Sequence, residues 1–156
     1  MRSKTGDSDQ FRIRPYQSGD LDDLYSICLQ TADNGQDATL LFRDPKLPGY
    51  VYVAPYVILE PSLAFVAEDR GGLGGYIVGA LETRAFEQRL ERDWWPALRA
   101  RYAEPSQDQA DDLSRPEQYA IHDVHHPWSI LDDLARCFPS HLHINLIPRL
   151  QGRGIG

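Results

Sequence analysis

The sequence is poor in cysteine, in positive charge and in long apolar segments. Its two cysteines, Cys28 and Cys137, are far apart and lack the spacing of a metal site. Both fall within apolar helical patterns, which predicts buried free thiols rather than a disulfide and fits a reducing cytoplasm. No run of about 18 apolar residues occurs, and the first ten residues lack the apolar core of a signal peptide, so neither a membrane span nor secretion is predicted.

The charge balance is acidic. The 16 lysines and arginines and 23 aspartates and glutamates give a formal net charge of −7, which argues against binding to nucleic acid or to an anionic membrane. A length of 156 residues with 42% hydrophobic residues is typical of one soluble globular domain. We therefore expect a single cytoplasmic domain over residues 11–156, preceded by a disordered polar leader over residues 1–10.

Apolar periodicity predicts a chain that mixes strands and helices. Pro96 is expected to kink or split the longest helix, because proline removes a backbone donor. The predicted elements are strand 11–15, a helix capped by Asp20 that closes at 34–35, a proline-rich segment with a short helix or strand at 56–60, paired strands 63–69 and 74–83, helices 85–103, 116–125 and 129–138, and strand 141–147.

Motifs of several common enzyme classes are missing. The glycines of "RGGLG" (70–74) join strand to strand, whereas a dinucleotide fingerprint joins strand to helix. The histidines of "HDVHHP" (122–127) lack a cysteine or a suitable carboxylate partner, so no metal site is predicted. The chain also contains no G-x-S-x-G, H-E-x-x-H or P-loop motif, which disfavours hydrolase, zinc-protease and Walker-type functions.

The C-terminal stretch carries the strongest functional signal. The alternating strand 141–147 leads into "QGRGIG" (151–156), which has glycines at alternate positions. Such spacing allows consecutive backbone N–H groups to point inward as an anion nest, and Arg149 and Arg153 add positive charge. The stretch is therefore predicted to hold a diphosphate.

"QGRGIG" also resembles the acyl-CoA signature Q/R-x-x-G-x-G/A of the GNAT superfamily of N-acetyltransferases. Over about residues 11–156 the chain is similar, more narrowly, to bacterial acetyltransferases related to the acetyltransferase-like domain of O-GlcNAcases. The resemblance implies an α/β fold of the layered α+β kind, with a mixed, mostly antiparallel central sheet flanked by helices. The segments that carry it are "TADNGQDAT", "APYVILEPSLAFVAED", "RLERDWWPALRARY" and "HLHINLIPRLQGRGIG".

The resemblance implies an acyltransferase that moves the acetyl group of acetyl-CoA to an amine acceptor by direct attack. Backbone groups at Leu146, Ile147 and Leu150 would pair with the pantetheine arm. The backbone amides expected to hold the pyrophosphate are those of Gln151, Gly152, Arg153, Gly154, Ile155 and Gly156.

A general base is expected on the polar face of the strand at 141–147. His143 is the first candidate and His141 the second on that face, because a near-neutral pKa suits the removal of a proton from an ammonium. Glu82, at the end of the preceding strand, is a further candidate, and Asn145 on the same polar face is expected near the acceptor. The alternative is that these side chains merely fill a polar sheet face.

The segment 84–139 is longer than the connection in a minimal member of the superfamily. We expect a helical insertion that forms a wall of the acceptor site, lined by Trp94, Trp95 and Tyr102. The resemblance also implies a further helix and strand after residue 156. We therefore predict a truncated acetyltransferase whose last strand has an unpaired edge and an exposed apolar face.

Two other classes of function stay open from the sequence. One is a non-catalytic acetyltransferase-like module that uses its cleft for protein contacts. The other is an interaction protein that assembles through the unpaired edge, by exchange with a second copy in a homodimer. The identity of the acceptor amine is not predicted.

Overall fold

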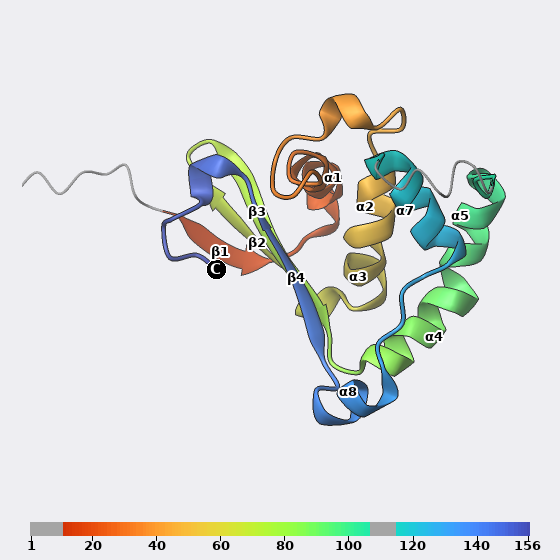
Figure 1. Ribbon diagram of the computed structural model, residues 1–156. Helices are drawn as coiled ribbons and strands as arrows, with labels where there is room; N and C mark the ends of the chain where they lie inside the picture. The colour runs from red at the N-terminus through yellow and green to blue at the C-terminus, as the bar shows by residue number, and fades with distance from the viewer. Residues whose placement is uncertain (1–10, 107–114) are drawn as a thin grey trace, which may run out of the picture.

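The computed structural model describes residues 11–106 and 115–156 as one antiparallel sheet with helices packed on it (Figure 1). The leader predicted over residues 1–10 lies outside the described residues. None of the described helices is long and apolar enough to cross a membrane.

The sheet has four strands in the order of the chain. Consecutive strands pair antiparallel, and the last strand forms one edge. This arrangement confirms the predicted layered α/β fold with an antiparallel sheet. The strands are β1 (Arg12–Pro15), β2 (Phe65–Asp69), β3 (Gly72–Ala80) and β4 (His141–Leu146).

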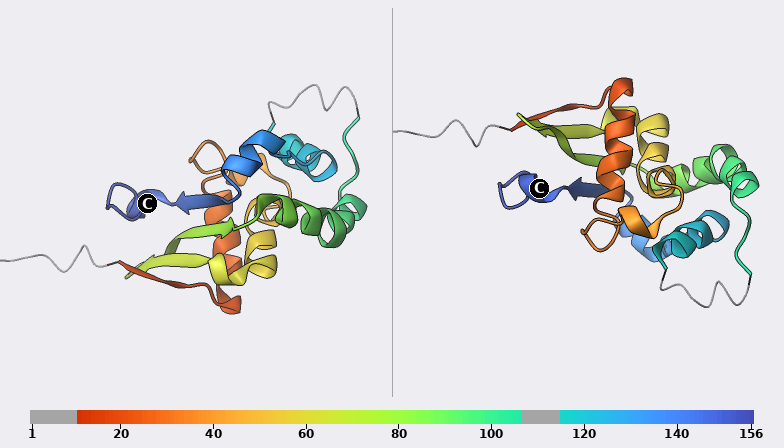
Figure 2. Two further views of the ribbon diagram at one scale, coloured as in Figure 1. Left: turned by 90° about the horizontal axis from the view of Figure 1, so that it is seen from below. Right: turned by 90° about the horizontal axis from the view of Figure 1, so that it is seen from above.

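The helices form a layer beside the sheet and a second group beyond it. Figure 1 and both views of Figure 2 place α4, α5 and α7 together, on the side of the molecule away from the C-terminal loop. The predicted long helix divides at Trp94, and Pro96 lies in the first turn of the second half, where its missing N–H is tolerated. The helices are α1 (Leu21–Leu29), α2 (Leu47–Tyr52), α3 (Ala54–Leu59), α4 (Thr83–Asp93), α5 (Trp95–Arg101), α7 (Pro116–His125) and α8 (Asp132–Cys137).

The helices cover one face of the sheet and leave the apolar residues of β4 on the other face exposed. On β3, Tyr76 and Val78 are at most 2% exposed, and they pair with Asn145 and His143 of β4, so the polar residues of β4 lie on the face that the helices cover. The apolar residues Leu142 and Ile144 lie on the opposite face and are 59% and 43% exposed. The exposed apolar face predicted for the last strand is therefore observed.

The two cysteines lie in different environments. Cys28 is buried in α1 at 3% exposure, and burial raises the pKa of its thiol to about 11. Cys137 is exposed, so the prediction of burial was wrong for this residue. The reason is that the short helix α8 has no buried residue and lies on the surface.

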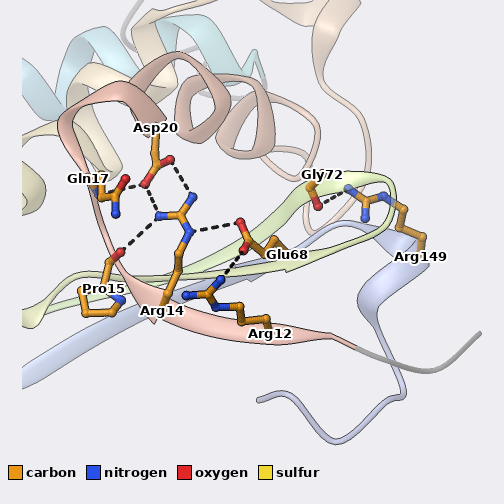
Figure 3. A network of polar contacts seen from close by, with 8 residues as sticks. All are labelled: Arg12, Arg14, Pro15, Gln17, Asp20, Glu68, Gly72 and Arg149. Atoms are coloured by element: carbon orange, nitrogen blue, oxygen red, sulfur yellow. Dashed lines mark hydrogen bonds and ion pairs between the residues drawn. The ribbon is translucent and has the colours of Figure 1, made fainter. Parts of the chain in front are cut away.

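A charged network joins β1 to the start of α1 and to β2 (Figure 3). Nitrogens of the Arg14 guanidinium lie 2.7 and 2.8 Å from the two carboxylate oxygens of Asp20 and 3.1 Å from Glu68 Oε2. Asp20 also accepts the backbone N–H of Gln17 at 2.8 Å. Asp20 occupies the N-cap position of α1 as predicted, but its side chain binds Arg14 and Gln17 rather than the helix amides.

Gly49 marks a close contact between α2 and α1. A Cβ added at Gly49 would lie 2.0 Å from Cδ1 and 2.8 Å from Cε1 of the buried Tyr25 ring. We expect Gly49→Ala to lower the free energy of unfolding by about 1–3 kcal/mol through overpacking, despite the better helix propensity of alanine. Urea denaturation checks this, with Gly19→Ala as control because its added Cβ meets nothing within 4 Å. Equal losses in the two variants would contradict the packing argument.

Candidate functional site

A cavity of about 500 Å³ lies where the helices meet the first half of β4. Its lining is mostly apolar and aromatic, and it includes the carboxylates Glu87, Glu91 and Asp123 but no lysine or arginine among the described residues. Glu87 and Glu91 pair with Arg84 and Arg99 outside the lining, which leaves Asp123 to favour a positive charge on a ligand with an apolar body. The apolar part of the lining comprises Val51, Phe86, Leu90, Trp95, Pro127, Trp128, Ile130 and Leu142.

Four polar side chains in this lining are joined by hydrogen bonds. The Tyr56 hydroxyl lies 2.9 Å from Nε2 of His141 and 3.0 Å from Nε2 of His143. Oγ1 of Thr83 lies 2.8 Å from Nδ1 of His141 and 2.8 Å from the carbonyl oxygen of Pro139. The structure thus brings both predicted histidines into one cavity and adds Tyr56 and Thr83, which the sequence patterns did not single out.

His141 is half-buried and His143 is exposed, but each ring contacts the buried Tyr56, and the loss of nearby water affects the titration of both histidines. Desolvation lowers the pKa of His141, against an opposing effect of Glu87, and desolvation together with His141 lowers the pKa of His143. Burial raises the pKa of the Tyr56 hydroxyl, so that group stays protonated. Two neutral imidazoles near pH about 7 are able to accept a proton.

The other residues predicted for this site have different positions. Trp95 is 5% exposed and lines the cavity. Trp94 instead donates its Nε1–H to the carbonyl oxygen of Tyr50 at 2.9 Å, and the Tyr102 hydroxyl donates to Asp44 at 2.6 Å. The helix breaks at Trp94, which explains why the neighbouring tryptophans separate. Glu82 is exposed at the N-cap of α4 and is not part of the lining.

A second cavity of about 260 Å³ lies at the other end of β4, beside the glycine-rich loop. Asn145 belongs to this cavity and donates from Nδ2 to Thr31 Oγ1 at 2.6 Å, so it does not line the first one. The two cavities therefore share one strand, with the histidines at its start and the loop after its end. The lining of the second cavity is Thr31, Gly35, Ile144, Asn145, Leu146, Gln151 and Gly156.

The backbone of the loop fits a bound anion. Gly152 has φ +68° and Gly154 has φ +70°, both in the left-handed region that favours glycine. A Cβ added at either position would meet nothing within 4 Å. Left-handed residues are a feature of anion nests, and the space beside the α-carbons of both glycines is open.

The side chains of the two arginines in this region bond to the β2–β3 hairpin. The Arg149 guanidinium bonds to Asp69 and to the carbonyl oxygen of Leu73 at 2.7 Å, and Figure 3 shows it beside Gly72. Arg153 bonds to Asp69 at 3.1 Å. Both cations therefore fasten the loop to the β2–β3 turn, because one carboxylate and several carbonyl groups meet there.

The backbone groups predicted to pair with pantetheine bond largely within the chain. The Ile147 N–H donates to the carbonyl of Gly74 at 2.9 Å, and the Leu150 N–H donates to the carbonyl of Ile147 at 3.0 Å. The Leu146 carbonyl accepts Nε2–H of Gln151 at 2.7 Å. Leu146 remains in the lining of the second cavity, whereas the amides of Ile147 and Leu150 are engaged elsewhere.

Comparison with known proteins identifies relatives in sequence and in structure. Protein O-GlcNAcase of Rattus norvegicus is 30% identical over 118 residues, and that of Mus musculus is 29% identical over 117 residues. Each match covers 75% of this chain but only 12% of the relative. The crystal structure of SsHAT superposes with a TM-score of 0.80 at 35% identity, and the match covers 93% of this chain and 70% of that one. No family model matches the chain.

Proposed function

Because the chain belongs to the GNAT superfamily of acetyltransferases, we propose that it transfers an acetyl group from acetyl-CoA to an amine. The observation that carries this proposal is the arrangement along β4. Two neutral histidines line a cavity suited to a cationic amine, and the same strand leads to a second cavity bounded by the glycine-rich loop. A cytoplasmic location is proposed with it, since that compartment supplies acetyl-CoA.

The donor side of the proposed site is built from backbone. Acetyl-CoA, when bound, supplies a thioester whose carbonyl carbon accepts the nitrogen. The amides around Gly152 and Gly154 would hold its pyrophosphate, and Leu146 and Asn145 line the cavity beside that loop. Net positive charge remains near the loop, because Arg149 and Arg153 share the single carboxylate of Asp69.

On the acceptor side, the protein binds an ammonium and removes its proton. Glu87 and Glu91 pair with Arg84 and Arg99, so Asp123, which accepts the Tyr52 hydroxyl, is the carboxylate that attracts the cation into this cavity. His143 then takes one proton from the nitrogen, which frees the lone pair. That lone pair forms the C–N bond as the C–S bond breaks, with its electrons passing to sulfur. The second proton of the nitrogen ends on the sulfur, which balances the reaction.

The cavity also indicates the class of acceptor. Its walls carry Trp95, Trp128 and Phe86, which suit an apolar or aromatic body, and Asp123 suits one positive charge. We therefore propose a primary amine on an apolar body as the acceptor, with phenylethylamine as the first probe. A screen of such amines against acetyl-CoA, followed by release of free CoA, tests this proposal directly.

A second candidate function is a non-catalytic module with the same fold. The engagement of the Ile147 and Leu150 amides within the chain favours it, because those groups are then not available to pantetheine. Calorimetric titration with acetyl-CoA separates the two functions. Binding supports the enzyme, whereas the absence of binding overturns it and leaves the non-catalytic module.

The loop assignment has its own test at Gly154. We expect Gly154→Asp to weaken acetyl-CoA binding by at least about tenfold, because a carboxylate opposes the diphosphate and φ +70° strains a residue with a Cβ. Gly154→Asn is the matched control, since it has the same shape and strain without the charge. A greater loss in the aspartate variant, measured by calorimetry, supports anion binding at the loop. Equal affinity in all three proteins would contradict it.

A further inference from the structure

We propose that Tyr56 and Thr83 are positioning residues, which hold the proton of neutral His143 on Nε2 and so leave Nδ1 as the atom that accepts a proton. The role of this arrangement in acetyl transfer rests on the proposed function. The placement of the protons does not, because it follows from a chain of hydrogen bonds that runs in one direction only. Neither residue was singled out by the sequence.

The series of hydrogen bonds begins at the carbonyl oxygen of Pro139, which can only accept a hydrogen. Oγ1 of Thr83 lies 2.8 Å from that oxygen and 2.8 Å from Nδ1 of His141, and a hydroxyl has one hydrogen to give. If it gave that hydrogen to His141, two oxygen atoms would face each other at 2.8 Å with no hydrogen between them. The hydroxyl therefore donates to Pro139 and accepts Nδ1–H from His141.

The same reasoning continues through the tyrosine. A neutral His141 with its proton on Nδ1 has a lone pair on Nε2, which accepts the Tyr56 O–H at 2.9 Å. The single hydrogen of Tyr56 is then used, so its contact of 3.0 Å with Nε2 of His143 requires a ring N–H there. Neutral His143 consequently carries its lone pair on Nδ1, which has no hydrogen-bond partner among the described residues.

The fold holds each member of this chain in place. Thr83 is 4% exposed at the first position of α4, and Tyr56 is 7% exposed on α3. The ring of Phe86, three residues after Thr83, stacks on Tyr56 at 4.6 Å between centroids. His141 and His143 are two residues apart on β4, so both rings reach the same hydroxyl from one face of the sheet.

The direction of the hydrogen bonds makes His143, and not His141, able to accept a proton without a rearrangement of its neighbours. A proton added at Nδ1 of His143 leaves every hydrogen bond as it is, because the imidazolium keeps its Nε2–H. A proton added at Nε2 of His141 forces Tyr56 to reverse and donate to His143, whose own proton must then move to Nδ1. Protonation of His141 therefore blocks the atom that would accept the substrate proton, and His141 acts on the reaction only through Tyr56.

The groups that face the pair set the pH range of this effect. Tyr56 approaches from α3, and Glu87, which pairs with Arg84, approaches from α4. The other charged side chains of the lining are Asp123 and Glu91, which pairs with Arg99. Desolvation lowers the pKa of both histidines below the ordinary value of 6.5. The series of hydrogen bonds with both histidines neutral is therefore complete above that value. It is lost as the pH falls through the pKa values of the two histidines in the folded protein.

Histidine NMR tests the placement of protons without any substrate. Protein labelled with ¹⁵N-histidine is observed by long-range ¹H–¹⁵N spectra at pH about 8, where the rings are neutral, and single His→Gln variants assign the signals. We expect His141 to carry its proton on Nδ1 and His143 on Nε2. Finding the opposite tautomer at His143 in the wild-type protein would overturn the proposal, whatever the variants do.

Variants then test which residues impose these tautomers. Tyr56→Phe removes the acceptor for His143 and should give a mixture of tautomers at His143, while His141 keeps its proton on Nδ1. Thr83→Val should release His141, and Thr83→Ser, which retains the hydroxyl, should restore the wild-type spectrum. Unchanged tautomers in both Tyr56→Phe and Thr83→Val would show that neither side chain positions the protons.

Kinetics with acetyl-CoA and phenylethylamine connect the tautomers to the reaction. Tyr56→Phe should lower kcat by about two- to fivefold with little change in KM for the amine, because only part of the His143 population then offers Nδ1. The acidic limb of its pH–rate profile should also move. If the predicted tautomers are observed but no turnover is detected, the proposed function is overturned and the proton placement stands. If the wild-type protein turns over and Tyr56→Phe has the same kcat, the positioning role is overturned.

Discussion

Replacing His143 by glutamine is expected to lower kcat/KM for acetyl transfer to phenylethylamine by about 10²- to 10⁴-fold, the range typical of a lost general base. Glutamine has a similar size and can still donate to the Tyr56 hydroxyl, so the hydrogen bond at 3.0 Å need not be lost. What it lacks is a titratable nitrogen. The affinity for acetyl-CoA, measured by calorimetry, should change little, because the glycine-rich loop lies beyond the other end of β4.

The pH dependence gives this prediction a second measurement. In the wild-type protein kcat/KM should fall on acidification below neutrality, since a protonated His143 cannot accept the substrate proton. In His143→Gln the part of that fall due to His143 should disappear. His126→Gln is the matched control, because His126 binds Glu104 on the surface and lies outside the cavity lining. Wild-type turnover in His143→Gln would mean that the base lies elsewhere, for example in a chain of water molecules.

The histidine pair could be predicted from sequence, but its partners could not. Alternation in the segment 141–147 places His141 and His143 on one strand face whatever the tertiary structure, because successive side chains point to opposite sides. Tyr56 lies in a proline-rich segment with no clear periodicity, and it reaches the histidines across 85 and 87 residues of chain. Thr83 was indistinguishable from any residue at a strand end. Contacts of this kind depend on how the helices fold back over the sheet.

The same distinction applies to the loop. Glycines at alternate positions predict a backbone conformation, and Gly152 and Gly154 adopt the left-handed one. The positive charge of Arg149 and Arg153 is equally visible in the sequence, but charge does not indicate direction. Both guanidiniums turn to Asp69 on the β2–β3 hairpin, a partner that only the tertiary structure brings within reach.

The largest expected effect on stability is at Asp20. Its side chain is 10% exposed and that of its partner Arg14 is 16% exposed, so the ion pair is largely removed from water. Asp20→Ala leaves the guanidinium with the Glu68 carboxylate and the Pro15 carbonyl oxygen, and it leaves the Gln17 N–H without its acceptor (Figure 3). Because breaking a buried pair on one side strands the remaining charge, we expect the free energy of unfolding to fall by about 3 kcal/mol at neutral pH.

The sign of the pH dependence makes that expectation specific. The hydrogen bond from Arg14 is the largest cause that lowers the pKa of the Asp20 carboxyl below its ordinary value of 3.8. A carboxyl whose pKa is depressed on folding contributes stability above the ordinary value, and that stability is lost as the pH falls through the folded value. Urea denaturation across the acidic range should therefore show the unfolding free energies of the wild-type protein and of Asp20→Ala converging as the pH falls.

Asp23→Ala is the control, because Asp23 is an exposed aspartate in the first turn of α1, and this variant should remain close to wild type throughout. A constant difference between wild type and Asp20→Ala at every pH would contradict a contribution from the ionised pair and would point to packing instead.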